Sequence, residues 1–167
     1  LNNLTINYNG MNLGTAGAVN LGIRTRMKGE VVLKMDNDVI VHQSGWAEEL
    51  EEVFKIDPSF GIVGLKRDDI LQNPAHENEL YRTTIKPINP TVTVELINDV
   101  MGTSTAYNPL LIDRVGYLNQ LSDFYGFDDV LYSARSIAAD FVNAFLPHIK
   151  ISHIDTGGDN YCEWKKR

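Results

Sequence analysis

Cysteine is almost absent from this sequence, since Cys162 is the only one among 167 residues. One cysteine cannot form an internal disulfide, and it excludes a zinc site built from paired cysteines. A chain without disulfides fits the reducing cytoplasm, which is where we expect this protein to act. The sequence also lacks a Gly-Lys-Ser/Thr phosphate loop and a serine-centred nucleophile elbow.

Basic residues are also scarce: 15 Lys and Arg face 22 Asp and Glu, so the formal net charge is −7. Nucleic acids are bound through clustered Lys and Arg, and we therefore expect no nucleic-acid partner. For the single basic cluster, residues 165–167, a solvated tail is favoured over a membrane or nucleic-acid contact. No apolar run approaches the ~18 residues of a membrane helix. Association with the inner face of a membrane would therefore need segments outside this chain.

The composition that is present, 43% hydrophobic and 22% charged, is typical of one globular domain with a sizeable core. Apolar periodicity predicts an α/β fold. Helices are expected at residues 16–27, 44–56, 109–115 and 130–141, and strands at 4–8, 31–38, 61–65, 91–97, 101–107 and 149–153. The order of strand, helix and strand over residues 31–65 predicts a parallel pair. Residues 66–90 are charged and weakly periodic, and we expect an excursion that folds over a ligand.

For two of these helices, the sequence also predicts an N-cap or a buried face. Ser44 is a good N-cap for the helix that follows it. In the last helix, the apolar positions predict the buried face. These positions are Val130, Ala134, Ile137, Ala138 and Phe141.

The most informative segment is an apolar, β-branched run, residues 31–35, that ends in Asp36, Asn37 and Asp38. Such a strand delivers two carboxylates to the carboxyl edge of a sheet, where α/β proteins bind ligands. Hard oxygen ligands suit Mg²⁺ or Mn²⁺, which in turn bind nucleotide phosphates. The alternative is that these side chains only cap a turn.

Other candidate residues lie in the second half of the chain. Asp128 and Asp129 begin a helix, where carboxylates are favoured by the dipole alone, but where one could also serve as a general base. His153 ends an apolar strand and could lie at the same sheet edge as Asp38, although such a histidine is more often structural. Gly102 begins a segment of small and hydroxyl residues that allows close backbone approach or is simply a strand.

The order of these features resembles family 2 glycosyltransferases of the GT-A fold. The motifs that carry the resemblance are residues 12–14, 18–22, 29–31, 36–38 and 126–130, Arg135 and His153. The resemblance implies a Rossmann-like, three-layer α/β/α sandwich around a mixed, mainly parallel sheet, formed by residues 1–167 as a single domain. It also implies that the domain is N-terminally incomplete, because the family begins with a strand, a helix and a strand, roughly 50 residues at ordinary element lengths.

Roles follow by matching positions to the family's motifs. Asp38 would bind the metal, and Asp36 would contact the ribose or the metal shell. Asp129 would be the catalytic base, with Asp128 in the place of the family's Glu. His153 would lie near the metal or the diphosphate. The nucleotide-sugar site would comprise Asp36, Asn37, Asp38, Gly102 and Arg135. Leu131 departs from the pattern, because many members carry an acid there, so the acceptor is not defined.

The resemblance implies an inverting transfer of a sugar from a nucleotide-diphosphate donor, a UDP-sugar, to an acceptor hydroxyl with Mn²⁺ or Mg²⁺ as cofactor. The acceptor would be a glycan, a lipid-linked molecule or a protein. Two alternatives stay open. The domain could bind a nucleotide sugar or glycan without turnover, or it could be purely structural, with its acids capping turns and helices.

Overall fold

The structure is a computed structural model that describes residues 6–67, 84–119 and 126–154. Within these residues lie four helices and seven strands. In chain order they are α1 (Gly14–Thr25), β1 (Val32–Met35), β2 (Val39–Val41), α2 (Trp46–Ile56), β3 (Phe60–Arg67), β4 (Thr84–Pro87), β5 (Thr93–Leu96), β6 (Ser104–Tyr107), α3 (Pro109–Val115), α4 (Asp128–Ala138) and β7 (Val142–His153). The predicted α/β class is confirmed.

The strands form one mixed sheet in the order β1-β6-β3-β7-β5-β4, with β2 paired to the far end of β7. Among the described strands, only β3 and β7 pair in parallel, and the other pairs are antiparallel. The expectation of a mainly parallel sheet is therefore wrong. The reason is that β6 lies between β1 and β3 and runs antiparallel to both, so the two strands of the expected parallel pair do not contact each other as neighbours.

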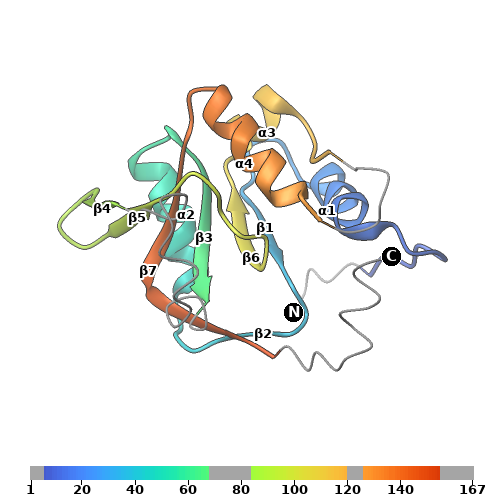
Figure 1. Cartoon of the computed structure of the whole chain (residues 1–167), viewed down its shortest axis with the longest axis horizontal. Coiled ribbons are helices and arrows are strands. Elements are labelled where there is room, and N and C mark those ends of the chain that lie inside the picture. The colour runs from blue at the N-terminus through green and yellow to red at the C-terminus, as the bar shows by residue number, and fades with distance from the viewer. Residues whose placement is uncertain (1–5, 68–83, 120–125, 155–167) are drawn as a thin grey trace.

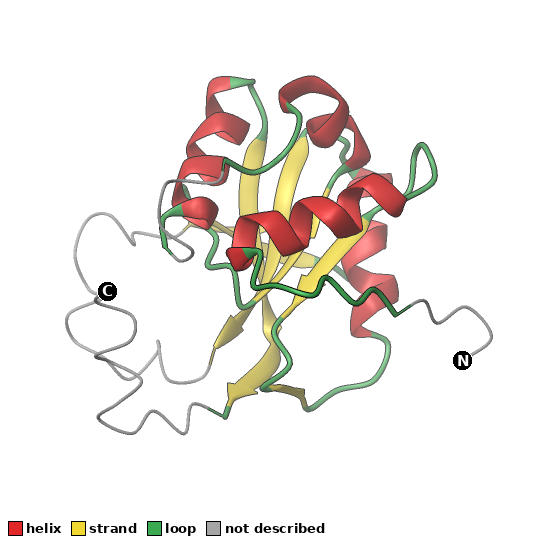
Figure 2. Ribbon diagram, turned by 90° about the vertical axis from the view of Figure 1, so that its right-hand side faces the viewer, coloured by secondary structure: helices red, strands yellow, loops and turns green. Residues whose placement is uncertain are grey.

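Helices cover both faces of the sheet (Figures 1 and 2). On one face, α2 buries Leu50, Val53 and Phe54 against the strands. On the other face, α1, α3 and α4 pack over a second cluster that includes Tyr107 and Phe145. In β7, Ala144 and Leu146 belong to the first cluster and Phe145 to the second, as the pleat of a strand requires.

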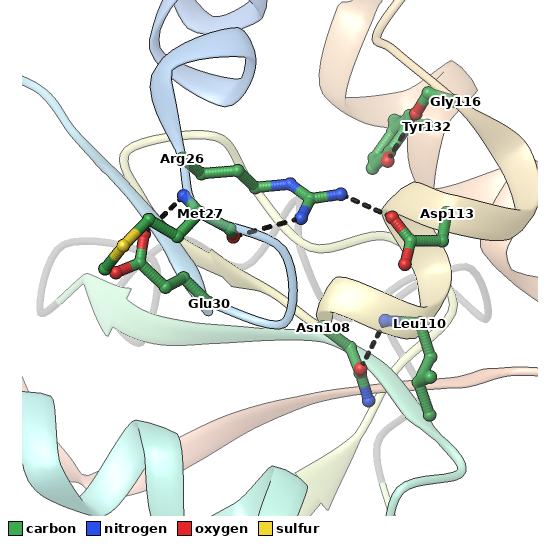
Figure 3. Close-up of polar contacts among 8 residues, drawn as sticks. All are labelled: Arg26, Met27, Glu30, Asn108, Leu110, Asp113, Gly116 and Tyr132. Carbon is green, nitrogen blue, oxygen red and sulfur yellow. Dashed lines mark hydrogen bonds and ion pairs between the residues drawn. The ribbon is translucent and has the colours of Figure 1, made fainter.

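Polar contacts join the helices of the second face (Figure 3). The Arg26 guanidinium, just after α1, donates to the Asp113 carboxylate on α3 at 2.5 Å. The Tyr132 hydroxyl on α4 donates to the Gly116 carbonyl at the end of α3, at 2.8 Å. These contacts hold α1 and α4 around α3, and so fix the helices that border the candidate site.

Local sequence signals predicted α1, α2 and α3 well. Two details are wrong, namely the N-cap of α2 and the buried face of α4. The N-cap of α2 is Gly45, at φ 77°, and not Ser44, which lies one residue earlier. The buried side of α4 consists of Tyr132, Ser133 and Ser136, whereas Val130 and Ile137 are 40% and 41% exposed.

Close packing explains why α4 buries small polar residues instead of its apolar stripe. A Cβ atom added to Gly61 of β3 would lie 2.4 Å from the Ser136 hydroxyl oxygen. That hydroxyl donates to the Asn143 side chain at 2.7 Å. A large apolar residue at position 136 would not fit between the helix and the sheet, so the helix is turned until its hydroxyls face inward.

The remaining expectations concern strand positions. Residues 6–8 form no strand, and residues 1–5 lie outside the described residues. The expected strand at residues 149–153 is the end of β7, which is twelve residues long. The excursion contains β4, which pairs with β5, but residues 68–83 lie outside the described residues, as do Cys162 and the basic cluster. No helix in residues 6–67, 84–119 and 126–154 is long and apolar enough to cross a membrane.

Candidate functional site

The expected strand over residues 31–38 ends at Met35, and Asp36, Asn37 and Asp38 form the connection from β1 to β2. The Asp36 amide donates to the Thr103 carbonyl at 3.0 Å, which extends the β1–β6 ladder by one bond. β2 then pairs with β7 so that Val39 lies opposite His153. The chain thus returns a histidine from the other end of the sequence to the two aspartates.

Asp36, Asp38 and His153 lie together as the sequence predicted. One ligand atom from each of them falls within 4.8 Å of the others. Asn37, which was predicted to bind the nucleotide sugar, is exposed in the same turn. The turn alone does not place His153 in this group, because the histidine comes from β7 through the pairing of that strand with β2.

Hydrogen bonding within this group is incomplete. The His153 side chain is 9% exposed, and its Nε2 atom lies 3.2 Å from Asp38 Oδ1. Among the described residues, however, Asp38 Oδ1 and His153 Nδ1 are buried and have no hydrogen-bond partner. Leaving such atoms unsatisfied costs about 1–3 kcal/mol each. A divalent cation is one ligand that would satisfy the carboxylate oxygen, and carboxylate donors suit Mg²⁺ or Mn²⁺.

Lys34 completes this side of the site, and our sequence analysis did not include it. Its ammonium donates to the Asp36 carboxylate and to the Gly102 carbonyl. The Lys34 side chain is 12% exposed, so its charge is largely removed from water. The signal was available, because a lysine inside an apolar strand needs a partner when it is buried.

Asp129 lies on the other side of Gly102, and Asp128 precedes it at the start of α4. The Gly102 amide donates to Asp129 Oδ2 at 3.0 Å, while the Gly102 carbonyl accepts from Lys34. A Cβ atom added to Gly102 would lie 3.3 Å from the same Asp129 oxygen. Gly102 therefore connects the predicted base to the Asp36 side of the site, and its lack of a side chain permits the close approach.

Asp128 on α4 and Asp99 near this helix have raised pKa values. Burial raises the pKa of Asp128, and the neighbouring Asp129 charge raises it further, whereas Lys34 opposes the rise. Burial also raises the pKa of Asp99, with a smaller contribution from Asp129. Asp99 was missed by sequence reasoning, because nothing in its local pattern places it beside Asp129. Such coupled acids are typical of sites that move protons.

A cleft of about 500 Å³ opens beside this group, between α1 and β1. Its wall includes Lys34 and Asp36 of the site and the small residues Gly14, Ala18 and Gly22 of α1. Its size is in the range of small-molecule pockets, which run from about 300 to 1,000 Å³. A ligand in this cleft would therefore meet both the Lys34 ammonium and the Asp36 carboxylate.

Arg135 contacts a different part of the molecule. Its guanidinium donates to the Tyr117 carbonyl at 2.6 Å, to Asn119 Oδ1 at 2.5 Å and to the Val115 carbonyl. Within the described residues, these contacts fix the chain after α3, and none joins Arg135 to the aspartates. The nucleotide-sugar role given to Arg135 has no support in its present contacts.

No protein-family model matches this chain, and no curated protein sequence does either. The residues around Gly102 therefore provide the main indication of function.

Proposed function

We propose that this chain is a GT-A-type domain of a family 2 glycosyltransferase, which transfers a sugar from a nucleotide-diphosphate donor to an acceptor hydroxyl with inversion. The observation that carries the proposal is the placement of two acidic groups on either side of Gly102, next to a nucleotide-sized cleft. An α/β fold with helices on both faces of the sheet supports it. The donor is expected to be a UDP-sugar.

The donor side would be formed by Asp36, Asp38 and His153, which would hold Mn²⁺ or Mg²⁺. The unpartnered Asp38 Oδ1 atom, with His153 Nε2 at 3.2 Å, supports this assignment. When bound, the cation would neutralise the charge that develops on the diphosphate leaving group. The cleft between α1 and β1 would hold the nucleoside.

The acceptor side would be formed by Asp129 and Asp128. Asp129 would take the proton of the attacking hydroxyl, a role that contributes about 10²–10⁴ in rate. Hydrogen bonds from the Gly102 amide at 3.0 Å and the Val130 amide at 2.9 Å fix the two oxygens of this carboxylate. Burial raises the pKa of Asp128, and the charge of the adjacent Asp129 raises it further, so the two carboxyl groups are electrostatically linked.

The proposal is tested by calorimetric titration of UDP with Mn²⁺ and then with EDTA, followed by a transfer assay. We expect metal-dependent UDP binding that is lost in Asp38→Asn. Asp129→Asn should bind UDP almost as tightly and lose about 10²-fold or more of the transfer rate. Full transfer activity in Asp129→Asn would refute the assignment of the base. UDP binding without transfer in the unaltered chain would indicate a non-catalytic nucleotide-sugar or glycan-binding module instead.

A further inference from the structure

Lys34 is a buried charge on an otherwise apolar strand. Strand alternation places it on the same face of β1 as Val32, which packs against the cluster beneath α1, α3 and α4. The side chain is 12% exposed, and its ammonium contacts Asp36 and the Gly102 carbonyl. Burying an ammonium costs several kcal/mol unless it is paired, so Lys34 depends on these acceptors.

We propose that Lys34 is a diphosphate-binding residue whose ammonium exchanges the Asp36 carboxylate for the donor's phosphate oxygens when a divalent cation binds. This inference rests on the proposed function, because it assigns a further residue to the same donor site. Lys34 and Asp36 both line the cleft between α1 and β1, so an anionic group next to Asp36 is also next to Lys34.

Electrostatics gives the reason for the exchange. A cation held by Asp36 takes the negative charge that Lys34 now uses and repels the ammonium nearby. The Gly102 carbonyl retains one of the three ammonium donors, and the four-carbon stem lets the remaining donors turn toward the cleft. A diphosphate supplies the negative charge that Asp36 no longer offers, and lysine binds phosphate as a mobile point charge.

The experiment compares Lys34→Met, Lys34→Arg and the control Lys55→Met, which removes the same charge from an exposed pair on α2. Free Mn²⁺ is measured by electron paramagnetic resonance, without nucleotide. UDP and uridine are then titrated by calorimetry at saturating Mn²⁺. Circular dichroism and the melting temperature establish that each variant is folded.

We expect Lys34→Met to bind Mn²⁺ alone at least about threefold more tightly, because a repelling charge is gone. The same variant should bind UDP about tenfold more weakly and uridine unchanged, because only the diphosphate contact is lost. Lys34→Arg should retain most of the UDP affinity, and Lys55→Met should match the unaltered protein in every titration.

Two results would overturn the inference and leave the proposed function standing. One is weaker Mn²⁺ binding by Lys34→Met, which would mean that Lys34 only orients Asp36. The other is an equal loss of UDP and uridine affinity, which would mean that Lys34 only supports the cleft. Absence of Mn²⁺ binding by the unaltered chain is a different outcome, because it would refute the cation site itself and the inference with it.

Discussion

Replacement of Asp38 by Asn should separate a cation site from a structural ion pair. Asp38 Oδ1 is buried without a hydrogen bond among the described residues, although His153 Nε2 lies 3.2 Å away. If the group binds a cation, the carboxylates of Asp36 and Asp38 repel one another when that cation is absent. Asp38→Asn should then leave the metal-free protein as stable as before or slightly more stable, since an uncharged amide is easier to bury than a carboxylate.

The size of the stabilisation by a bound cation follows from the linkage between ligand binding and folding. A ligand that binds only the folded state at 100 times its dissociation constant stabilises it by about 2.7 kcal/mol. For a chain of 167 residues, 1 kcal/mol shifts the melting temperature by about 2–4 °C, so Mn²⁺ should raise it by about 5–10 °C. Asp38→Asn and His153→Ala should lose most of this increase.

The assay is thermal unfolding followed by circular dichroism, with Mn²⁺ and then with excess EDTA. Asp113→Asn provides a control, because that carboxylate pairs with Arg26 in another part of the fold. The reasoning is refuted if Mn²⁺ leaves the melting temperature unchanged while Asp38→Asn lowers it by several degrees. That combination would identify Asp38 and His153 as an ion pair that only stabilises the fold.

Further predictions concern Gly102, Asp128 and the buried pair of Lys66 and Glu95. Gly102→Ala places a Cβ atom 3.3 Å from Asp129 Oδ2, so the transfer rate should fall severalfold while UDP affinity changes little; equal losses in both would argue against a role on the acceptor side. Burial on folding raises the pKa of Asp128, so the folded state holds its proton more tightly and loses stability as pH rises past the usual pKa of an aspartate. Asp128→Asn should thus stabilise the protein in urea titrations at pH 7 but not at pH 3; a loss at pH 7 would contradict the burial argument. Lys66 Nζ lies 2.7 and 2.8 Å from the two Glu95 oxygens, and both side chains are at least 86% buried. Lys66→Met should therefore cost about 3–5 kcal/mol in urea unfolding, whereas a cost below about 1 kcal/mol would indicate a pair no stronger than a surface one.

Structural features that depend on residues close together in the sequence were predicted well. Helix α3 is an example, because Asn108 accepts from the Leu110 amide at 2.8 Å and Pro109 begins the helix. The orientation of α4 was not predicted, because its buried face depends on Gly61 in a distant strand, which leaves space only for small side chains. Apolar periodicity identifies a buried face only from its hydrophobic residues. It therefore cannot predict a helix whose buried face includes serines.

Some parts of the candidate site could likewise be predicted from the sequence, and other parts could not. Asp36, Asp38 and His153 could be predicted as a group, because each lies where an apolar strand ends, and strand ends meet at the edge of a sheet. Lys34 and Asp99 were missed. Lys34 lies only two residues from Asp36, but its contact with the Gly102 carbonyl joins residues 68 apart in sequence. Asp99 lies beside Asp129 only because distant segments of the chain meet in the fold.

The error in the predicted sheet and the position of Gly102 have one cause. A parallel neighbour would bring the carboxyl end of its own strand beside Asp36. β6 is antiparallel to β1, so Met35 lies opposite Ser104, and the residues that precede β6 come to lie beside the acidic turn. Gly102 is among those residues, and its two backbone groups reach Lys34 on one side and Asp129 on the other. The antiparallel strand is therefore what joins the two acidic groups, and a sheet with only parallel neighbours at this edge would leave them without this connection.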